Sequence, residues 1–218
     1  GCGEGDPMKK RLFSICYMFL ITLFFTSMVS AVKFFNEDRI ERNEALKLQR
    51  IILEVLNIPI GDNRSDEGLA KIFESRVKRI QVKDTSLYVG YEKDDQTVIG
   101  YAFPIGGPGF WGPISGMVAV NPQASRILGI AFYKHSETPG LGGRLTEEWF
   151  TNQFSGIPLY PIEGEKRIFY LKPQGGRKAP NELDAITGAT GTSRAVESFL
   201  NRDLDHFMKQ VWGTVRKG

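Results

Sequence analysis

Hydroxyl side chains gather in the segment DAITGATGTSR, residues 184–194, which also holds two glycines. The hydroxyl residues are Thr187, Thr190, Thr192 and Ser193. An amphipathic run follows them, and the first turn of a helix has unpaired N–H groups and a positive dipole end that suit a phosphate. The segment lacks the lysine of a P-loop, so it does not fit a nucleoside triphosphate cradle. Ordinary capping by Thr192 or Ser193 needs one hydroxyl and leaves the other threonines unexplained.

Two further loops are rich in glycine. HSETPGLGGRL, residues 135–145, combines a proline with three glycines, which lets its backbone and Leu141 press against a flat partner. IGGPGFWGPISG, residues 105–116, contains the adjacent pair Phe110-Trp111. The alternative interpretation of the first loop is a strand-to-helix turn. For the second it is a long hairpin connection whose aromatic rings plug the end of a sheet.

Cysteine, histidine and charge restrict the available chemistry. The cysteines, Cys2 and Cys16, lie before or inside an apolar run, so the rest of the chain has no thiolate for a disulfide, an iron–sulfur cluster or a Cys-type zinc site. The two histidines, His135 and His206, show no metal-binding spacing, and we predict no metal site. A net charge of +3 leaves no nucleic-acid-binding footprint.

The apolar run covers residues 12–32 without a charge. As a helix rising ~1.5 Å per residue, it is long enough to cross the roughly 30 Å hydrocarbon core of a bilayer. Three basic residues at 9–11 precede it, and such residues stay on the cytoplasmic side. We therefore expect a cytoplasmic segment at 1–11, a single-pass anchor at 12–32 in the inner (cytoplasmic) membrane, and an extracytoplasmic domain at 33–218.

The alternative is a cleaved signal peptide. Residues 29–31, Val-Ser-Ala, have the small side chains that a signal peptidase accepts. The apolar run exceeds the usual 7–15-residue signal core, which favours the anchor.

The periodicity of apolar residues predicts the elements that position the loops. A period of three to four predicts helices at 36–57, ended by Pro59 and Gly61, and at 65–77, 145–154 and 194–211. A period of two predicts strands at 79–82, 87–91, 98–103, 116–121, 127–133 and 167–172. The order indicates an α+β fold: a twisted antiparallel sheet with flanking helices, preceded by one N-terminal transmembrane helix.

These loops carry a resemblance to a known family. Asp184-x-x-Thr187-Gly188-Ala189-Thr190, followed by Thr192-Ser193, resembles the flavinylation motif of the FMN-binding domain found in Na+-translocating NADH:quinone oxidoreductase and in the Rnf electron-transport complex. Glu137-Thr138-Pro139-Gly140-Leu141-Gly142 is similar to that family's second signature. Phe110-Trp111-Gly112-Pro113 sits where members carry a similar glycine-rich loop, and the resemblance covers nearly the whole chain from Met8.

The resemblance implies an FMN joined through its phosphate to a threonine hydroxyl, by analogy Thr190. A separate flavin transferase that uses FAD would attach it. Thr187 stands where serine is more usual, and Gly191 stands where members have a larger apolar residue. The second departure leaves the choice between Thr190 and Thr192 as acceptor open.

The remaining implied site residues divide between attachment and flavin contact. Thr138 and Leu141 would contact the edge and face of the isoalloxazine, and Trp111 is a candidate for the other side. The rest of the set comes from the same motifs: Asp184, Thr187, Gly188, Ala189, Thr192, Ser193, Glu137 and Gly140.

The function implied is a one-electron relay in a membrane complex, because the sequence has no evident nucleophile–base pair or nicotinamide fingerprint. Its partners would be other membrane subunits of an ion-translocating complex linked to NADH or ferredoxin, with Na+ or H+ as the coupled ion. Two alternatives remain open: a solitary extracytoplasmic flavoprotein shuttle, and a flavin-free assembly or tethering subunit.

Overall fold

The computed structural model describes residues 7–61, 65–161, 167–175 and 179–216. The chain divides into two compact units, residues 1–45 and residues 46–218, and each is described by itself. Part of the expected segment 1–11, residues 1–6, lies outside the described residues.

The described part of the first unit, residues 7–45, lies within one helix, α1 (Pro7–Val55), where the sequence predicted two helices at 12–32 and 36–57. No proline or glycine separates the two predicted segments, so nothing interrupts the backbone hydrogen bonds. The most apolar stretch of α1 has a mean hydropathy of 2.1, and none of it is buried. A helix of this length and composition can cross a membrane, and a signal sequence near an N-terminus has the same properties.

The C-terminal end of α1 belongs to the second unit and differs from the prediction. The helix ends at Val55, before Pro59 and Gly61, because Asn57 adopts a left-handed φ of 56°. The N–H of Ile58 then donates to the carbonyl oxygen of Leu53 at 2.9 Å. Asparagine is one of the few residues that tolerate this conformation, so it ends the helix as glycine commonly does.

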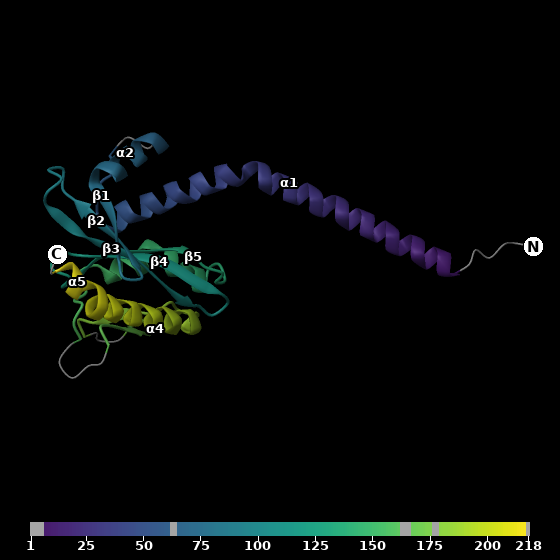
Figure 1. The fold of residues 1–218 in the computed structure, drawn as a ribbon. Coiled ribbons are helices and arrows are strands. Elements are labelled where there is room, and N and C mark those ends of the chain that lie inside the picture. Colours follow the sequence, from purple (N-terminus) through teal and green to yellow (C-terminus); the bar gives the residue numbers. More distant parts are fainter. Residues whose placement is uncertain (1–6, 62–64, 162–166, 176–178, 217–218) are drawn as a thin grey trace, which may run out of the picture. The chain divides into compact units, whose positions relative to one another are not determined.

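The second unit contains the predicted antiparallel sheet, with its five strands ordered as in the chain (Figure 1). They are β1 (Val77–Val82), β2 (Thr85–Tyr91), β3 (Val98–Pro108), β4 (Pro113–Val120) and β5 (Ile127–Lys134). The long connection expected at 105–116 is mostly strand, because β3 and β4 stay paired as far as Pro108 and Pro113. Only a tight tip, residues 109–112, joins them.

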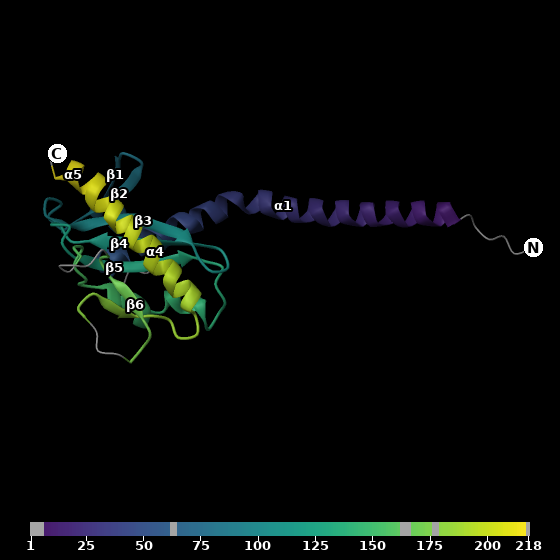
Figure 2. The same ribbon diagram turned by 90° about the horizontal axis from the view of Figure 1, so that it is seen from below.

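Helices cover both faces of the sheet. On one face, the C-terminal end of α1 and α2 (Asp66–Arg76) form an apolar cluster that includes Ile52, Leu56 and Leu69. Ser65 caps α2 as predicted, since its Oγ accepts from the N–H of Gly68 at 3.1 Å. On the other face, α4 (Thr190–His206) lies across the strands, as Figure 2 shows.

The elements around α4 differ in detail from the prediction. The helix expected at 145–154 consists of three short pieces: η1 (Gly142–Thr146), α3 (Glu148–Thr151) and η2 (Asn152–Phe154). The strand expected at 167–172 shortens to β6 (Tyr170–Lys172), which pairs in parallel with an unpredicted strand, β7 (Glu182–Asp184). After α4 the chain continues through a π-helical segment, η3 (Phe207–Trp212), and α5 (Gly213–Val215).

Candidate functional site

The three glycine-rich loops meet at one pocket of about 240 Å³. The tip of the β3–β4 hairpin, the loop after β5 and the start of α4 each contribute lining residues. They are Phe110, Trp111, Glu137, Thr138, Leu141, Gly142, Gly188, Ala189, Thr190, Gly191 and Thr192. The structure therefore brings together residues that lie far apart in the sequence, as the motifs predicted.

Glu137 connects the three loops. Its side chain is buried, with 4% of its surface exposed. Oε1 accepts from the backbone N–H groups of Phe110 at 2.9 Å and Trp111 at 3.0 Å. Oε2 accepts from the hydroxyl of Thr192 at 2.5 Å. A carboxylate accepts hydrogen bonds only, and three donors satisfy it here without an ion pair to any described residue.

The hairpin tip presents its two aromatic residues at the pocket. Gly109 N–H donates to the Gly112 carbonyl at 2.8 Å, which closes the tip. Phe110 and Trp111 are 61% and 67% exposed, and their rings meet edge to face with centroids 5.2 Å apart. The interpretation in which these rings plug the end of the sheet is therefore wrong. They line the mouth of the pocket instead.

The loop after β5 makes a tight turn that presents Leu141. The N–H of Leu141 donates to the carbonyl of Thr138 at 3.2 Å, with Pro139 and Gly140 between them. Gly140 has a φ of 73°, as the third position of a type II turn requires. Thr138 and Leu141 line the pocket, whereas Gly140 shapes the turn without lining it.

The start of α4 separates the hydroxyl groups of the third loop. Thr190, the first helical residue, is exposed and lines the pocket. Thr192 is only 3% exposed, and its hydroxyl is bound to Glu137. The Oγ of Ser193 donates to the Ala189 carbonyl and accepts from the N–H of Ile186, both at 3.0 Å.

Helix capping by Thr192 or Ser193 is therefore excluded. The helix begins before both residues, and its cap, Ala189, makes no side-chain hydrogen bond. The Thr192 hydroxyl instead binds Glu137 in the loop after β5, and the Ser193 hydroxyl binds Ile186 and Ala189 in the loop just before α4.

The other predicted site residues lie beside this pocket. Thr187 and Ser193 line a second pocket of about 380 Å³, which shares Gly188 and Thr190 with the first. Asp184 lines neither pocket. Its backbone N–H donates to Oε1 of Gln153 at 2.7 Å, which fixes the strand that leads into the loop at residues 185–189.

Three lining residues were missed as site residues: Phe110, Gly142 and Gly191. A Cβ atom on Gly142 would overlap the Thr192 hydroxyl, and one on Gly191 would overlap the ring of Phe110. Gly191 is thus needed for close packing against Phe110. The glycine-rich composition was the available signal, but it does not say which neighbour occupies the space.

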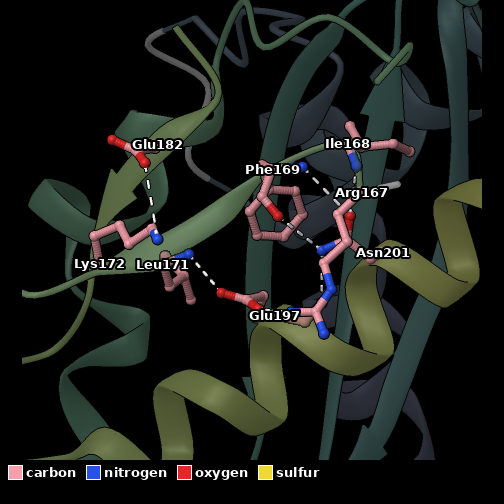
Figure 3. Close-up of polar contacts among 8 residues, drawn as sticks. All are labelled: Arg167, Ile168, Phe169, Leu171, Lys172, Glu182, Glu197 and Asn201. Carbon is pink, nitrogen blue, oxygen red and sulfur yellow. Dashed lines mark hydrogen bonds and ion pairs between the residues drawn. The ribbon is translucent and has the colours of Figure 1, made fainter. Parts of the chain in front are cut away.

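Residues 168–171 are held against α4 by hydrogen bonds to side chains of the helix (Figure 3). Oδ1 of Asn201 accepts from the N–H of Ile168 at 2.8 Å, and its Nδ2 donates to the carbonyl of Phe169 at 3.0 Å. Oε2 of Glu197 accepts from the N–H of Leu171 at 2.6 Å. These bonds fix β6 beside the helix. Because β7 pairs with β6, they also fix the strand that precedes the loop at residues 185–189.

The described residues contain no group of three or more His, Cys, Asp or Glu side chains that could hold a metal ion.

Residues 109–205 match the family model of the FMN-binding domain. The match begins at the hairpin tip and includes all the residues that line the pocket. The match covers less than half of the chain, and residues 109–205 are similar to the FMN-binding domain family.

Curated proteins similar to this chain include C subunits (NqrC) of Na(+)-translocating NADH-quinone reductase. The Yersinia pestis protein is 35% identical over 98 residues, which is 45% of this chain and 37% of the relative. The Pasteurella multocida protein is 32% identical over 133 residues, or 61% of this chain and 51% of the relative. The chain thus matches about half or less of the length of these relatives.

Solved structures share the fold of the domain. The crystal structure of the NqrC protein from Parabacteroides distasonis superposes with a TM-score of 0.66 at 23% identity, covering 79% of this chain and 95% of that one. The NqrC structure from Shewanella oneidensis gives 0.64 at 21% identity, covering 75% and 91%. The antiparallel sheet with flanking helices is therefore the fold of these NqrC proteins.

Proposed function

We propose that the chain is a membrane-anchored flavoprotein subunit that relays electrons through an FMN held covalently at Thr190. Its complex would be of the type to which the relatives belong, a Na+-translocating NADH:quinone reductase. The family match to the FMN-binding domain and the similarity to NqrC support this proposal.

The pocket suits a flat, largely apolar ring system. Leu141, Phe110 and Trp111 offer exposed apolar surface at its mouth. Gly188, with a φ of 77°, faces Leu141 so closely that a Cβ there would stand 3.1 Å from its Cδ2 atom. A Cβ on Gly142 would overlap the hydroxyl of Thr192, so both glycines allow close packing at the pocket. The exposed apolar side chains at the mouth can pack against an isoalloxazine.

One observation carries the assignment of the acceptor: the two candidate threonines differ in what their hydroxyls do. The Thr192 hydroxyl is buried and donates to Glu137. Thr190 is exposed at the pocket, and its hydroxyl makes no hydrogen bond with the described residues. A flavin transferase must reach the hydroxyl that it modifies, so we assign the phosphoester to Thr190. The nearby N-terminal end of α4 favours the negative charge of the phosphate.

The lining residues suit an electron relay better than a self-contained enzyme. Glu137 is the one carboxylate among them, and donors from the protein already occupy both of its oxygens. A bound FMN would supply the redox chemistry. The side chains would hold it, exclude water from part of it and set its surroundings.

The partners follow from this role. A relay needs a donor and an acceptor in the same membrane, so we propose other subunits of the complex as partners, together with a flavin transferase during maturation. The basic residues at 9–11 favour placement of the domain on the extracytoplasmic side of the inner membrane.

The mass of the intact chain tests the proposal. After co-expression with a flavin transferase, the purified full-length protein should be heavier by one FMN minus one water. It should also remain fluorescent in a denaturing gel. A chain of unmodified mass that assembles normally would instead support a flavin-free tethering role.

A further inference from the structure

We infer that the carboxylate of Glu137 is a positioning and charge-bearing group that lowers the reduction potential of a flavin held in the pocket. The inference rests on the proposed function, and it assigns to one buried residue the control of how readily the flavin accepts an electron.

Burial strengthens the electrostatic interaction of Glu137 with groups in the pocket. The side chain lines the pocket and is nearly inaccessible to water. Charges interact more strongly in such surroundings than in bulk water, because the effective dielectric constant of the protein is lower. The screening that weakens an exposed carboxylate is therefore largely missing at this position.

No described cation neutralises this carboxylate. Arg144, the arginine of the same loop, pairs with Glu147 at 3.1 Å and lies 5.0 Å from the ring centroid of Trp149. His135 does not donate to the carboxylate. Its Nδ1 accepts from the backbone N–H of Glu137 at 3.2 Å. The groups that face the carboxylate oxygens are neutral donors, and they leave its net charge in place.

A negative charge beside the flavin opposes reduction. An electron that enters from an external donor adds one negative charge to the flavin while the donor is oxidised by one electron. Repulsion from Glu137 raises the free energy of the reduced form, which lowers the potential. A proton taken up with the electron would cancel the added charge and remove the effect.

The site offers two variants that separate charge from hydrogen bonding. Glu137→Gln removes the charge and keeps the shape, because the amide oxygen can accept from the Phe110 and Trp111 N–H groups and the amide nitrogen can donate to Thr192. Thr192→Val keeps the charge and removes one donor to it. If Glu137 only held the loops together, Thr192→Val would shift the reduction potential more than Glu137→Gln, because only Thr192→Val removes a hydrogen bond.

The test is an equilibrium redox titration of the full-length flavin-loaded protein in detergent, with dithionite as the reductant and a reference dye as the indicator. At the midpoint of the wild-type protein, we expect Glu137→Gln to raise the ratio of reduced to oxidised flavin by roughly tenfold. Thr192→Val should lower the same ratio, since the carboxylate loses a donor that spreads its charge. Thr192→Ser, which keeps the hydroxyl, should match the wild type.

Three results would overturn the inference. One is an unchanged or lower ratio in Glu137→Gln, and another is a shift in the same direction in both variants. If Glu137→Gln does not fold, Thr192→Val decides alone, and a ratio equal to or above the wild type contradicts the inference. Absence of flavin from the wild-type chain would contradict the proposed function as well. A flavin-loaded chain whose ratio of reduced to oxidised flavin does not change with these substitutions would contradict the inference alone.

Discussion

The hydroxyl of Thr192 donates to the carboxylate of Glu137 at 2.5 Å, across 55 positions of the sequence. This bond joins the first turn of α4 to the loop after β5, and the same carboxylate holds the β3–β4 tip through Phe110 and Trp111. The pocket is therefore held together by one buried side chain. This side chain binds the hydroxyl of Thr192 and leaves Thr190 exposed at the pocket.

Replacement of Thr192 by valine should destabilise the domain. The change removes one donor from a buried carboxylate, and an unmet buried polar group costs about 1–3 kcal/mol. Urea unfolding of the full-length protein in detergent should show this loss in the free energy of unfolding, whereas Thr192→Ser should show little of it. Equal stability of the valine variant and the wild type would mean that the bond does not hold the loops together.

Gly142→Ala should destabilise the same junction by a different cause. The added methyl would overlap the Thr192 hydroxyl and lie 2.8 Å from Oε2 of Glu137, and such overpacking costs about 1–3 kcal/mol. Gly213→Ala is a matched control, because a methyl there has no neighbour within 4 Å and the backbone is helical. Thermal unfolding should separate the two variants. A Gly142→Ala protein as stable as the control would contradict the close packing of this junction.

Leu141→Asp tests the division between flavin contact and flavin attachment. Leu141 offers an exposed apolar side chain to the pocket and has no hydroxyl to carry the phosphoester, so the flavin should stay covalently bound at Thr190. A new carboxylate beside the ring should lower the reduction potential and change the fluorescence quenching, whereas Leu141→Met should do neither. Loss of the attached flavin from a folded Leu141→Asp protein would place this loop in transferase recognition.

The topology of the chain gives a fourth prediction. The basic residues at 9–11 should keep the start of α1 in the cytoplasm, so alkaline phosphatase fused after Gly218 should be active. A reporter that works only in the cytoplasm should be inactive at the same position, and the opposite pattern would reverse the orientation. N-terminal sequencing separates the anchor from a cleaved leader, because a chain cut after Ala31 would begin at Val32.

The sheet could be predicted from the sequence because its strands follow local rules. Alternating apolar residues bounded by turn residues located all five strands of the antiparallel sheet, and the confirmed α+β class followed from their order. The short parallel strand β7 was missed, since it has three residues and depends on pairing with β6. Periodicity carries no information about such a partner.

The site could be predicted only in part. The motifs identified the three loops that line the pocket. They do not show that Thr192 is buried against Glu137 while Thr190 is exposed, because this difference depends on contacts between distant residues. The boundary of α4 shows the same limit. A run of small residues weakens a helix prediction, so the helix was expected from Arg194, whereas it begins at Thr190.

The attachment of FMN at Thr190 is the central claim, and peptide mass mapping of the flavin-loaded chain tests it most directly. Thr190→Val removes the hydroxyl with little change of shape at an exposed position, so the domain should fold. After co-expression with a flavin transferase, the wild type should carry one FMN minus one water on the peptide that contains Thr190, and Thr190→Val should carry none. Thr192→Val, the matched control, should remain modified at Thr190. Full modification of Thr190→Val, with loss in Thr192→Val, would contradict the assignment and place the flavin on Thr192.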